Sequence, residues 1–92
     1  MVKIKQSKPL TELKKGDKVK VDGKEYEVDA HIVLIDHGKG TKEMALEIFD
    51  VKADKDFQLR YFSNNVEGSF EFYELQNEFM YTRVGDVKKV EW

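Results

Sequence analysis

The dipeptide Asp22-Gly23 constrains the fold of this chain more than any other local feature. It separates two runs in which apolar and polar residues alternate, Lys18 to Val21 and Lys24 to Val28. Such a pair between such runs is typical of a β-hairpin with a two-residue type I′ turn. In that register one face carries Val19, Val21, Tyr26 and Val28, and the other pairs Lys18 with Glu27 and Lys20 with Glu25. A four-residue loop would keep the same two faces, so the sequence predicts one buried face and one face of compensating charges.

Further apolar runs lie before and after this hairpin at intervals of about ten residues and are separated by turn residues, which is typical of an antiparallel β-barrel or sandwich. They cover residues 2–6, 24–35, 57–62, 69–75, 79–84 and 87–92. Pro9, with Leu10 and Leu13 on one side, predicts one short helical turn over Pro9 to Lys14. We therefore predict a single β-rich domain over residues 1–92. Its expected architecture is a small, mostly antiparallel barrel, SH3-like or related, with about seven or eight strands.

Residues 43–52 fit two patterns. Met44, Leu46 and Ile48 alternate as in a strand, whereas Met44, Ile48 and Val51 also fit helical spacing after Thr41 as an N-cap. The β-forming residues in this segment favour a strand.

The predicted core collects the apolar positions of these runs. The continuous apolar stretch Ile32 to Ile35 predicts a strand that is covered on both faces, as in a bent strand of a small barrel. The expected core residues are Leu10, Leu13, Val19, Val21, Tyr26, Val28, Ile32, Leu34, Leu46, Ile48, Leu59, Tyr61, Phe70, Phe72, Phe79 and Tyr81.

Composition excludes several classes of function. The chain has no cysteine, which removes disulfides, zinc-thiolate sites and thiol nucleophiles and suits a reducing cytoplasm. Sixteen basic residues against 18 acidic ones give a net charge of −2, which does not favour nucleic acid. No apolar run could span a membrane and no signal-peptide core is present, so a cytoplasmic protein is expected.

Catalytic and metal-binding patterns are weak. The serines fall in predicted turns, and Glu71 and Glu74 lie on opposite faces of a strand, so we predict that the chain is not an enzyme. Asp29 and His31 would share a strand face, but His37 lies beyond the apolar run. We therefore predict neither a metal site nor a cofactor.

Two groups of residues are candidates for binding. The loop from His37 to Lys42 offers free backbone amides and cations that could meet a phosphate, but it lacks P-loop spacing, and a plain solvated turn is favoured. Eight of the 11 aromatic residues lie between Phe57 and Tyr81, near two arginines, as in a stacking platform or in an ordinary sheet core. The candidate binding residues are His37, Gly38, Lys39, Gly40, Lys42, Arg60, Tyr73 and Arg83.

One resemblance rests on the hairpin and the loop that follows it. Leu13-Lys14-Lys15-Gly16-Asp17, then Val21 to Val28, and then Gly38-Lys39-Gly40 resemble the N-terminal SH3-like barrel of elongation factor P and its archaeal and eukaryotic relatives. In that family the loop lysine is modified and reaches toward the ribosomal peptidyl-transferase centre. The resemblance thus implies that role for Lys39.

A second resemblance covers more of the chain. Gly16-Asp17, Asp22-Gly23, Tyr26-Glu27-Val28, Glu47-Ile48-Phe49, Leu59 to Phe62 and Phe70 to Leu75 follow one another in the order of a family catalogued as domain of unknown function 4178. This resemblance implies a hairpin followed by an aromatic-rich antiparallel meander, and no activity.

From the missing catalytic set and the surplus of aromatic residues we predict a non-catalytic binding module for a protein or ribonucleoprotein partner. The alternatives are a translation-factor-like module with a functional lysine loop, and a structural domain that self-associates. The expected self-association would form a homo-oligomer through exposed strand edges, either Val2 to Gln6 or Val87 to Trp92.

Overall fold

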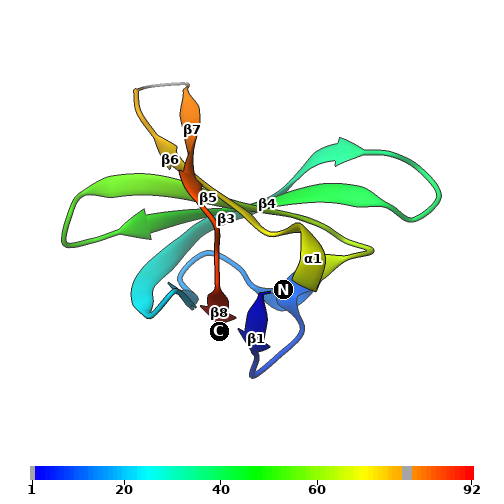
Figure 1. Cartoon of the computed structure of the whole chain (residues 1–92), viewed down its shortest axis with the longest axis horizontal. Helices are drawn as coiled ribbons and strands as arrows, with labels where there is room; N and C mark the ends of the chain where they lie inside the picture. Colours follow the sequence, from blue (N-terminus) through cyan, green and yellow to red (C-terminus); the bar gives the residue numbers. More distant parts are fainter. Residues whose placement is uncertain (1, 78–79) are drawn as a thin grey trace.

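A computed structural model describes residues 2–77 and 80–92, and its strands form one eight-stranded sheet (Figure 1). The elements in chain order are β1 (Lys3–Lys5), the 3₁₀ turn η1 (Leu10–Glu12), β2 (Lys18–Val21), β3 (Lys24–Asp36), β4 (Lys42–Asp50), β5 (Lys55–Phe62), α1 (Val66–Ser69), β6 (Glu71–Leu75), β7 (Tyr81–Gly85) and β8 (Lys89–Glu91). The strand order in the sheet is β1-β8-β2-β3-β4-β5-β6-β7. The prediction of a mostly β, barrel-like fold with one short turn after Pro9 is confirmed.

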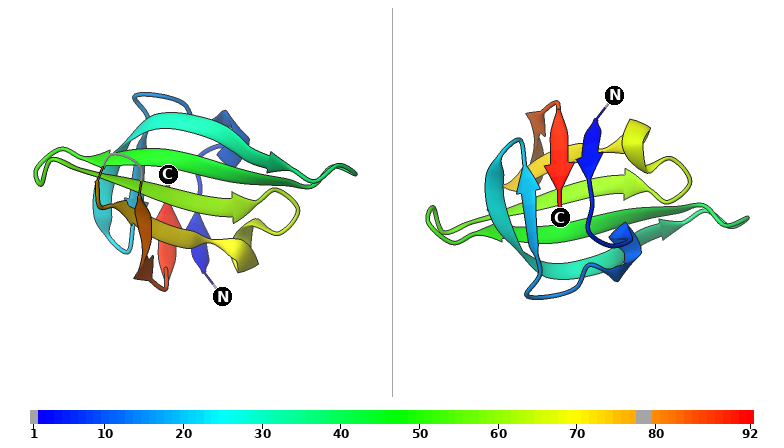
Figure 2. Two further views of the ribbon diagram at one scale, coloured as in Figure 1. Left: turned by 90° about the horizontal axis from the view of Figure 1, so that it is seen from above. Right: turned by 90° about the horizontal axis from the view of Figure 1, so that it is seen from below.

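The sheet bends strongly but does not close. β8 and β1 lie beneath the long strands β3, β4 and β5 and run across them (Figure 2). β8 pairs with β2 on one side and with β1 on the other, so it is an interior strand. The edges of the sheet are β1 and β7. The expectation that Val87 to Trp92 offers a free edge is therefore wrong, because β1 covers it through a parallel pairing that local sequence patterns do not indicate.

The hairpin at Asp22-Gly23 has the predicted register. Asp22 and Gly23 have φ angles of 51° and 86°, as a type I′ turn requires. Val19 lies opposite Tyr26, and Lys18 lies opposite Glu27 with their charged groups 3.8 Å apart. The Asp22 carboxylate also accepts hydrogen bonds from the backbone amides of Lys88 and Lys89, where β8 begins, each at 2.9 Å. The turn therefore anchors the C-terminal strand as well as joining β2 to β3.

The core lies between the bent sheet and the strands beneath it. Tyr26 is 5% exposed and contacts the rings of Phe57 and Phe72, at centroid distances of 5.2 and 5.8 Å. Most predicted core residues are buried, and the structure adds Phe57, Val87 and Val90 to them. Tyr81 is only half-buried, because it lies in the edge strand β7. Phe79 lies outside the described residues.

Two predicted core residues are wrong because β3 contains bulges. The register against β4 shifts between Val28 and Ala30, and again between Val33 and Ile35. An extra residue reverses the alternation of faces, so His31 and Val33 lie opposite Leu46 and Met44 on the inner face. Ile32 is consequently 36% exposed, and Leu34 is half-buried. The first bulge also breaks the face that Asp29 and His31 were expected to share.

The ambiguous segment 43–52 is mostly strand, as predicted, since β4 runs through it to Asp50. Asp50 is 3% exposed and ends the strand. Its carboxylate lies 2.6 Å from the Lys24 ammonium and accepts hydrogen bonds from the amides of Lys52 and Ala53. The hydrogen bond from Lys24 is the main reason that the pKa of Asp50 lies below its ordinary value. The buried carboxylate thus fixes the turn between β4 and β5 to the first hairpin.

The segment 63–68, expected to be a turn, contains the start of the short helix α1. The Asn65 side chain caps it by accepting from the Gly68 amide at 3.3 Å. The strand predicted from Ser69 therefore begins at Glu71 instead.

Candidate binding groove

A groove of about 950 Å³ lies on the inner face of the sheet, beside the free end of the β3–β4 hairpin. The segment before and including η1 forms one wall, α1 forms another, and β3, β4 and β5 form the floor. Half of the lining residues are apolar and contribute most of the exposed lining surface: Ile4, Pro9, Leu10, Val33, Met44, Tyr61, Val66 and Trp92. Polar and charged residues complete it: Gln6, Ser7, Lys8, Thr11, Gly40, Lys42, Ser63 and Glu67. Its size and apolar character are those of a ligand-binding cleft.

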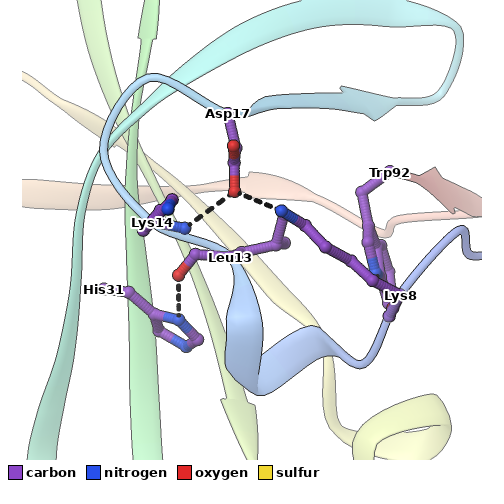
Figure 3. A network of polar contacts seen from close by, with 6 residues as sticks. All are labelled: Lys8, Leu13, Lys14, Asp17, His31 and Trp92. Atoms are coloured by element: carbon purple, nitrogen blue, oxygen red, sulfur yellow. Dashed lines mark hydrogen bonds and ion pairs between the residues drawn. The ribbon is translucent and has the colours of Figure 1, made fainter.

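Polar contacts hold the N-terminal wall in place (Figure 3). The Lys8 ammonium lies 2.7 Å from the Asp17 carboxylate, which also accepts from the Lys14 amide at 3.1 Å. Both contacts lower the pKa of Asp17, with the Lys8 hydrogen bond as the largest cause. The Trp92 indole donates to the Lys8 carbonyl at 2.7 Å. The two ends of the chain are therefore joined at this wall.

His31 connects the same wall to the floor of the groove. Its Nδ1 donates to the Leu13 carbonyl at 2.9 Å, because a carbonyl can only accept (Figure 3). Its Nε2 is then the acceptor for the Tyr61 hydroxyl, 2.6 Å away. Burial raises the pKa of Tyr61 to about 12, so this hydroxyl keeps its proton. The pair joins β3, β5 and the connection from η1 to β2.

Ser63 fixes the other side of the groove to the β3–β4 hairpin. Its hydroxyl accepts from the Lys42 amide at 2.9 Å and donates to the Gly40 carbonyl at 3.3 Å. Its backbone amide donates to the Lys42 carbonyl at 2.9 Å. These bonds hold the entry to α1 against the end of the hairpin. The walls of the groove are therefore preformed by hydrogen bonds.

The structure gathers the predicted loop residues at one hairpin tip. His37, Gly38, Lys39 and Gly40 are exposed at the end of the long axis of the molecule, where the β3–β4 hairpin projects (Figure 1). Lys39 has a φ of 53° between two glycines that also have positive φ. Among residues 2–77 and 80–92, neither Lys39 nor Lys42 forms an ion pair. Gly40 and Lys42 line the mouth of the groove, so part of the predicted loop belongs to it.

The other predicted binding residues lie elsewhere. Tyr73 and Arg83 belong to the β6–β7 hairpin, which rises from the side of the sheet opposite β1 and β8 (Figure 1). The Arg60 guanidinium lies 4.0 Å from the centroid of the Tyr73 ring. Arg83 lies 3.4 Å from Glu71 and 3.5 Å from Asp86. Both arginines are thus engaged by neighbouring side chains, and the structure does not bring them together with the loop.

The groove residues that sequence reasoning missed are chiefly Val33, Val66 and Trp92. For Val33, the signal in the sequence was the apolar run Ile32 to Ile35. Four consecutive apolar residues in a strand place apolar side chains on both of its faces, so the face that is left exposed must also carry apolar side chains. The bulges decide which of these side chains enters the groove. Trp92 reaches the groove only through pairings between segments that are far apart in the sequence.

The described residues contain no cluster of three or more histidine or carboxylate side chains able to hold a metal ion. Within the same part of the chain, no helix is long and apolar enough to cross a membrane. Comparison of the chain with protein-family models, with curated proteins and with solved structures finds no match.

Proposed function

We propose that this protein is a non-catalytic binding module whose groove takes up an apolar segment of a protein partner. The observation that carries this proposal is the groove itself, an apolar cleft of about 950 Å³ with walls from segments far apart in the chain. The hydrogen bonds of His31 and Trp92 fix those walls before any ligand arrives. A preformed apolar cleft with a few polar groups is the usual form of a binding site.

A polypeptide fits this groove better than a nucleic acid. The rim carries both signs of charge, with Lys42 on one side and Glu67 on another. Nucleic acid is bound mainly through several cations that neutralise phosphates, and a net charge of −2 opposes this. Apolar walls with an uneven polar rim instead resemble the surfaces that bind protein segments. As part of this proposal we place the module in the cytoplasm, since the chain contains no cysteine.

The chain offers a matched pair of methionines for the test. Met44 lines the groove, whereas Met80 is 56% exposed beside the edge strand β7. Peptides are selected from a displayed random library on the wild-type protein, and their affinities are then measured for Met44→Glu and Met80→Glu by fluorescence anisotropy. We expect Met44→Glu to weaken binding at least about tenfold and Met80→Glu to change it less than about twofold.

Native amide NMR spectra of both variants would show that they remain folded. The proposal is wrong if no peptide is enriched, or if folded Met44→Glu binds the enriched peptides as well as Met80→Glu does.

A translation-factor-like role for Lys39 is the second candidate. It is supported by the position of Lys39, exposed at the projecting hairpin tip and without an ion pair among the described residues. In the elongation factor P family, which the surrounding residues resemble, the loop lysine is modified. Intact-mass and peptide mass spectrometry of protein from its native source should then show an adduct on Lys39. An unmodified Lys39 together with no co-sedimentation with ribosomes would exclude this candidate.

A further inference from the structure

The part of β3 that follows His31 has a free backbone edge. β3 pairs with β2 only as far as Glu27, and from Ala30 to Asp36 it pairs with β4 alone. Beyond Glu27 the connection before β2 reaches β3 through the Val28 backbone and then through the contact between Leu13 and His31. Among the described residues, β4 is the only element whose backbone pairs with Ile32 to Ile35. Unpaired strand edges are the places where other chains add strands.

The same four residues expose apolar side chains on both faces. Val33, on the inner face, is 48% exposed and lines the groove. Ile35 is 50% exposed and lies opposite Glu43, while Ile32 is 36% exposed and lies opposite Ala45. An exposed apolar edge is a liability in a protein that leaves it uncovered. Natural edges are commonly blunted by charged residues or by bulges; this one carries no charged residue between His31 and Asp36, and its register against β4 shifts once, between Val33 and Ile35.

Charges flank this edge at both ends. Lys14 and Lys15 lie in the connection that meets β3 near His31, and Lys39 lies at the hairpin tip beyond the other end. None of these lysines forms an ion pair within the described ranges. Asp29 and Asp36 are also present, and the Asp36 carboxylate turns back to accept from the Gly38 amide at 2.9 Å. The ends of the edge therefore favour a ligand that carries acidic residues on either side of an apolar centre.

We propose that the edge of β3 from Ile32 to Asp36 pairs with an extended, apolar peptide segment with acidic flanks, which adds a strand to the sheet. This inference rests on the proposed function and names the form in which the partner binds. The added strand would place alternate side chains beside Val33 at the mouth of the groove. Backbone pairing supplies affinity in this mode, and the alternate side chains supply specificity.

A second copy of this chain is a poorer occupant of the same edge. The free edge ends at the Leu13 contact on one side and at the hairpin turn on the other. A symmetric pair through this short segment would bury far less than the roughly 1,200–2,000 Å² typical of a stable interface. A peptide does not need to bury so large an area at this edge, because its side chains also contact the neighbouring groove.

The test uses a short capped peptide in which valine and threonine alternate between terminal glutamates. It is added to the whole ¹⁵N-labelled chain up to about 2 mM, where binding of millimolar affinity is visible. We expect amide shifts and slower hydrogen exchange at Ile32 to Asp36. An analogue with every internal amide N-methylated keeps the side chains but cannot donate backbone hydrogen bonds. It should bind at least about tenfold more weakly.

A matched pair of edge variants completes the experiment. Ile35→Glu places an acid on the β3 edge, and Val84→Glu places one on the β7 edge, where Val84 is 54% exposed. Only Ile35→Glu should weaken binding at least about tenfold. Equal binding of the N-methylated analogue would overturn strand addition while leaving the groove proposal intact. The absence of any binding of the parent peptide would also overturn strand addition. Concentration-dependent broadening of the Ile32 to Ile35 signals without peptide would overturn it too, because it would identify a second copy of the chain as the occupant.

Discussion

The hydrogen bond between His31 and Tyr61 allows a quantitative prediction about how the groove is held together. Tyr61 is 2% exposed, and its hydroxyl lies 2.6 Å from His31 Nε2. Tyr61→Phe removes this bond and leaves the half-buried imidazole able to reach water, so it should cost about 1 kcal/mol of unfolding free energy. His31→Ala removes this bond and the bond to the Leu13 carbonyl, and it leaves a buried hydroxyl without a partner. The two lost bonds cost about 1 kcal/mol each and the stranded hydroxyl adds roughly 1–3 kcal/mol, so this variant should lose about 3–5 kcal/mol.

The double variant separates these contributions. With Phe at position 61 the shared bond is already absent and no hydroxyl remains to be stranded, so His31→Ala should cost about 2–4 kcal/mol less than it does in the wild type. The assay is urea unfolding at neutral pH, followed by circular dichroism and tryptophan fluorescence, for the wild type, both single variants and the double variant. Costs that add within about 0.5 kcal/mol would refute the claim that these side chains act as a pair.

Other predictions concern the core and the charged groups. Tyr26→Ala should destabilise the fold by about 3 kcal/mol or more in denaturant melts, because it removes a buried ring; a loss below about 1 kcal/mol would contradict its place in the core. The pKa of Asp50 lies below 3.8 because Lys24 donates to it, so its stabilisation is present above that pH and is lost as pH falls through the folded value. Asp50→Asn should therefore make urea midpoints less sensitive to acid, and an unchanged slope would exclude this role. The pKa of Tyr61 is raised from 10.0 to about 12, so stability should fall as pH rises through that interval. Tyr61→Phe should reduce this alkaline slope.

Local turn chemistry was enough to predict the first hairpin. Asp22 and Gly23 both adopt positive φ, and few residue pairs other than Asp-Gly do so readily. With the turn fixed, the register and the buried face of Val19 and Tyr26 follow from alternation alone. The same reasoning found the strand ending at Asp50, because its β-forming residues outweigh a helical spacing that is also present.

The bulges and the groove could not be predicted in this way. A bulge at Asp29 depends on how β3 pairs with β4, and one extra residue exchanges the faces of Ile32 and Val33. The position of β8 depends on a parallel pairing with β1, from the other end of the chain. Only this long-range arrangement brings Trp92 to Lys8 and closes one wall of the groove. The loop around Lys39, by contrast, could be predicted from the sequence, because Gly38 and Gly40 interrupt the strand pattern and favour a turn.

Intermolecular nuclear Overhauser effects test the central claim most directly. The protein carries ¹³C-methyl methionine and a ¹⁵N-labelled Trp92 indole, and it is bound to an unlabelled peptide selected on the wild type. We predict contacts from apolar peptide side chains to the Met44 methyl and to Trp92, both of which line the groove. The exposed Met80 serves as the internal control and should show none. A tight complex whose contacts reach Met80 but neither Met44 nor Trp92 would contradict the assignment of the groove as the binding site.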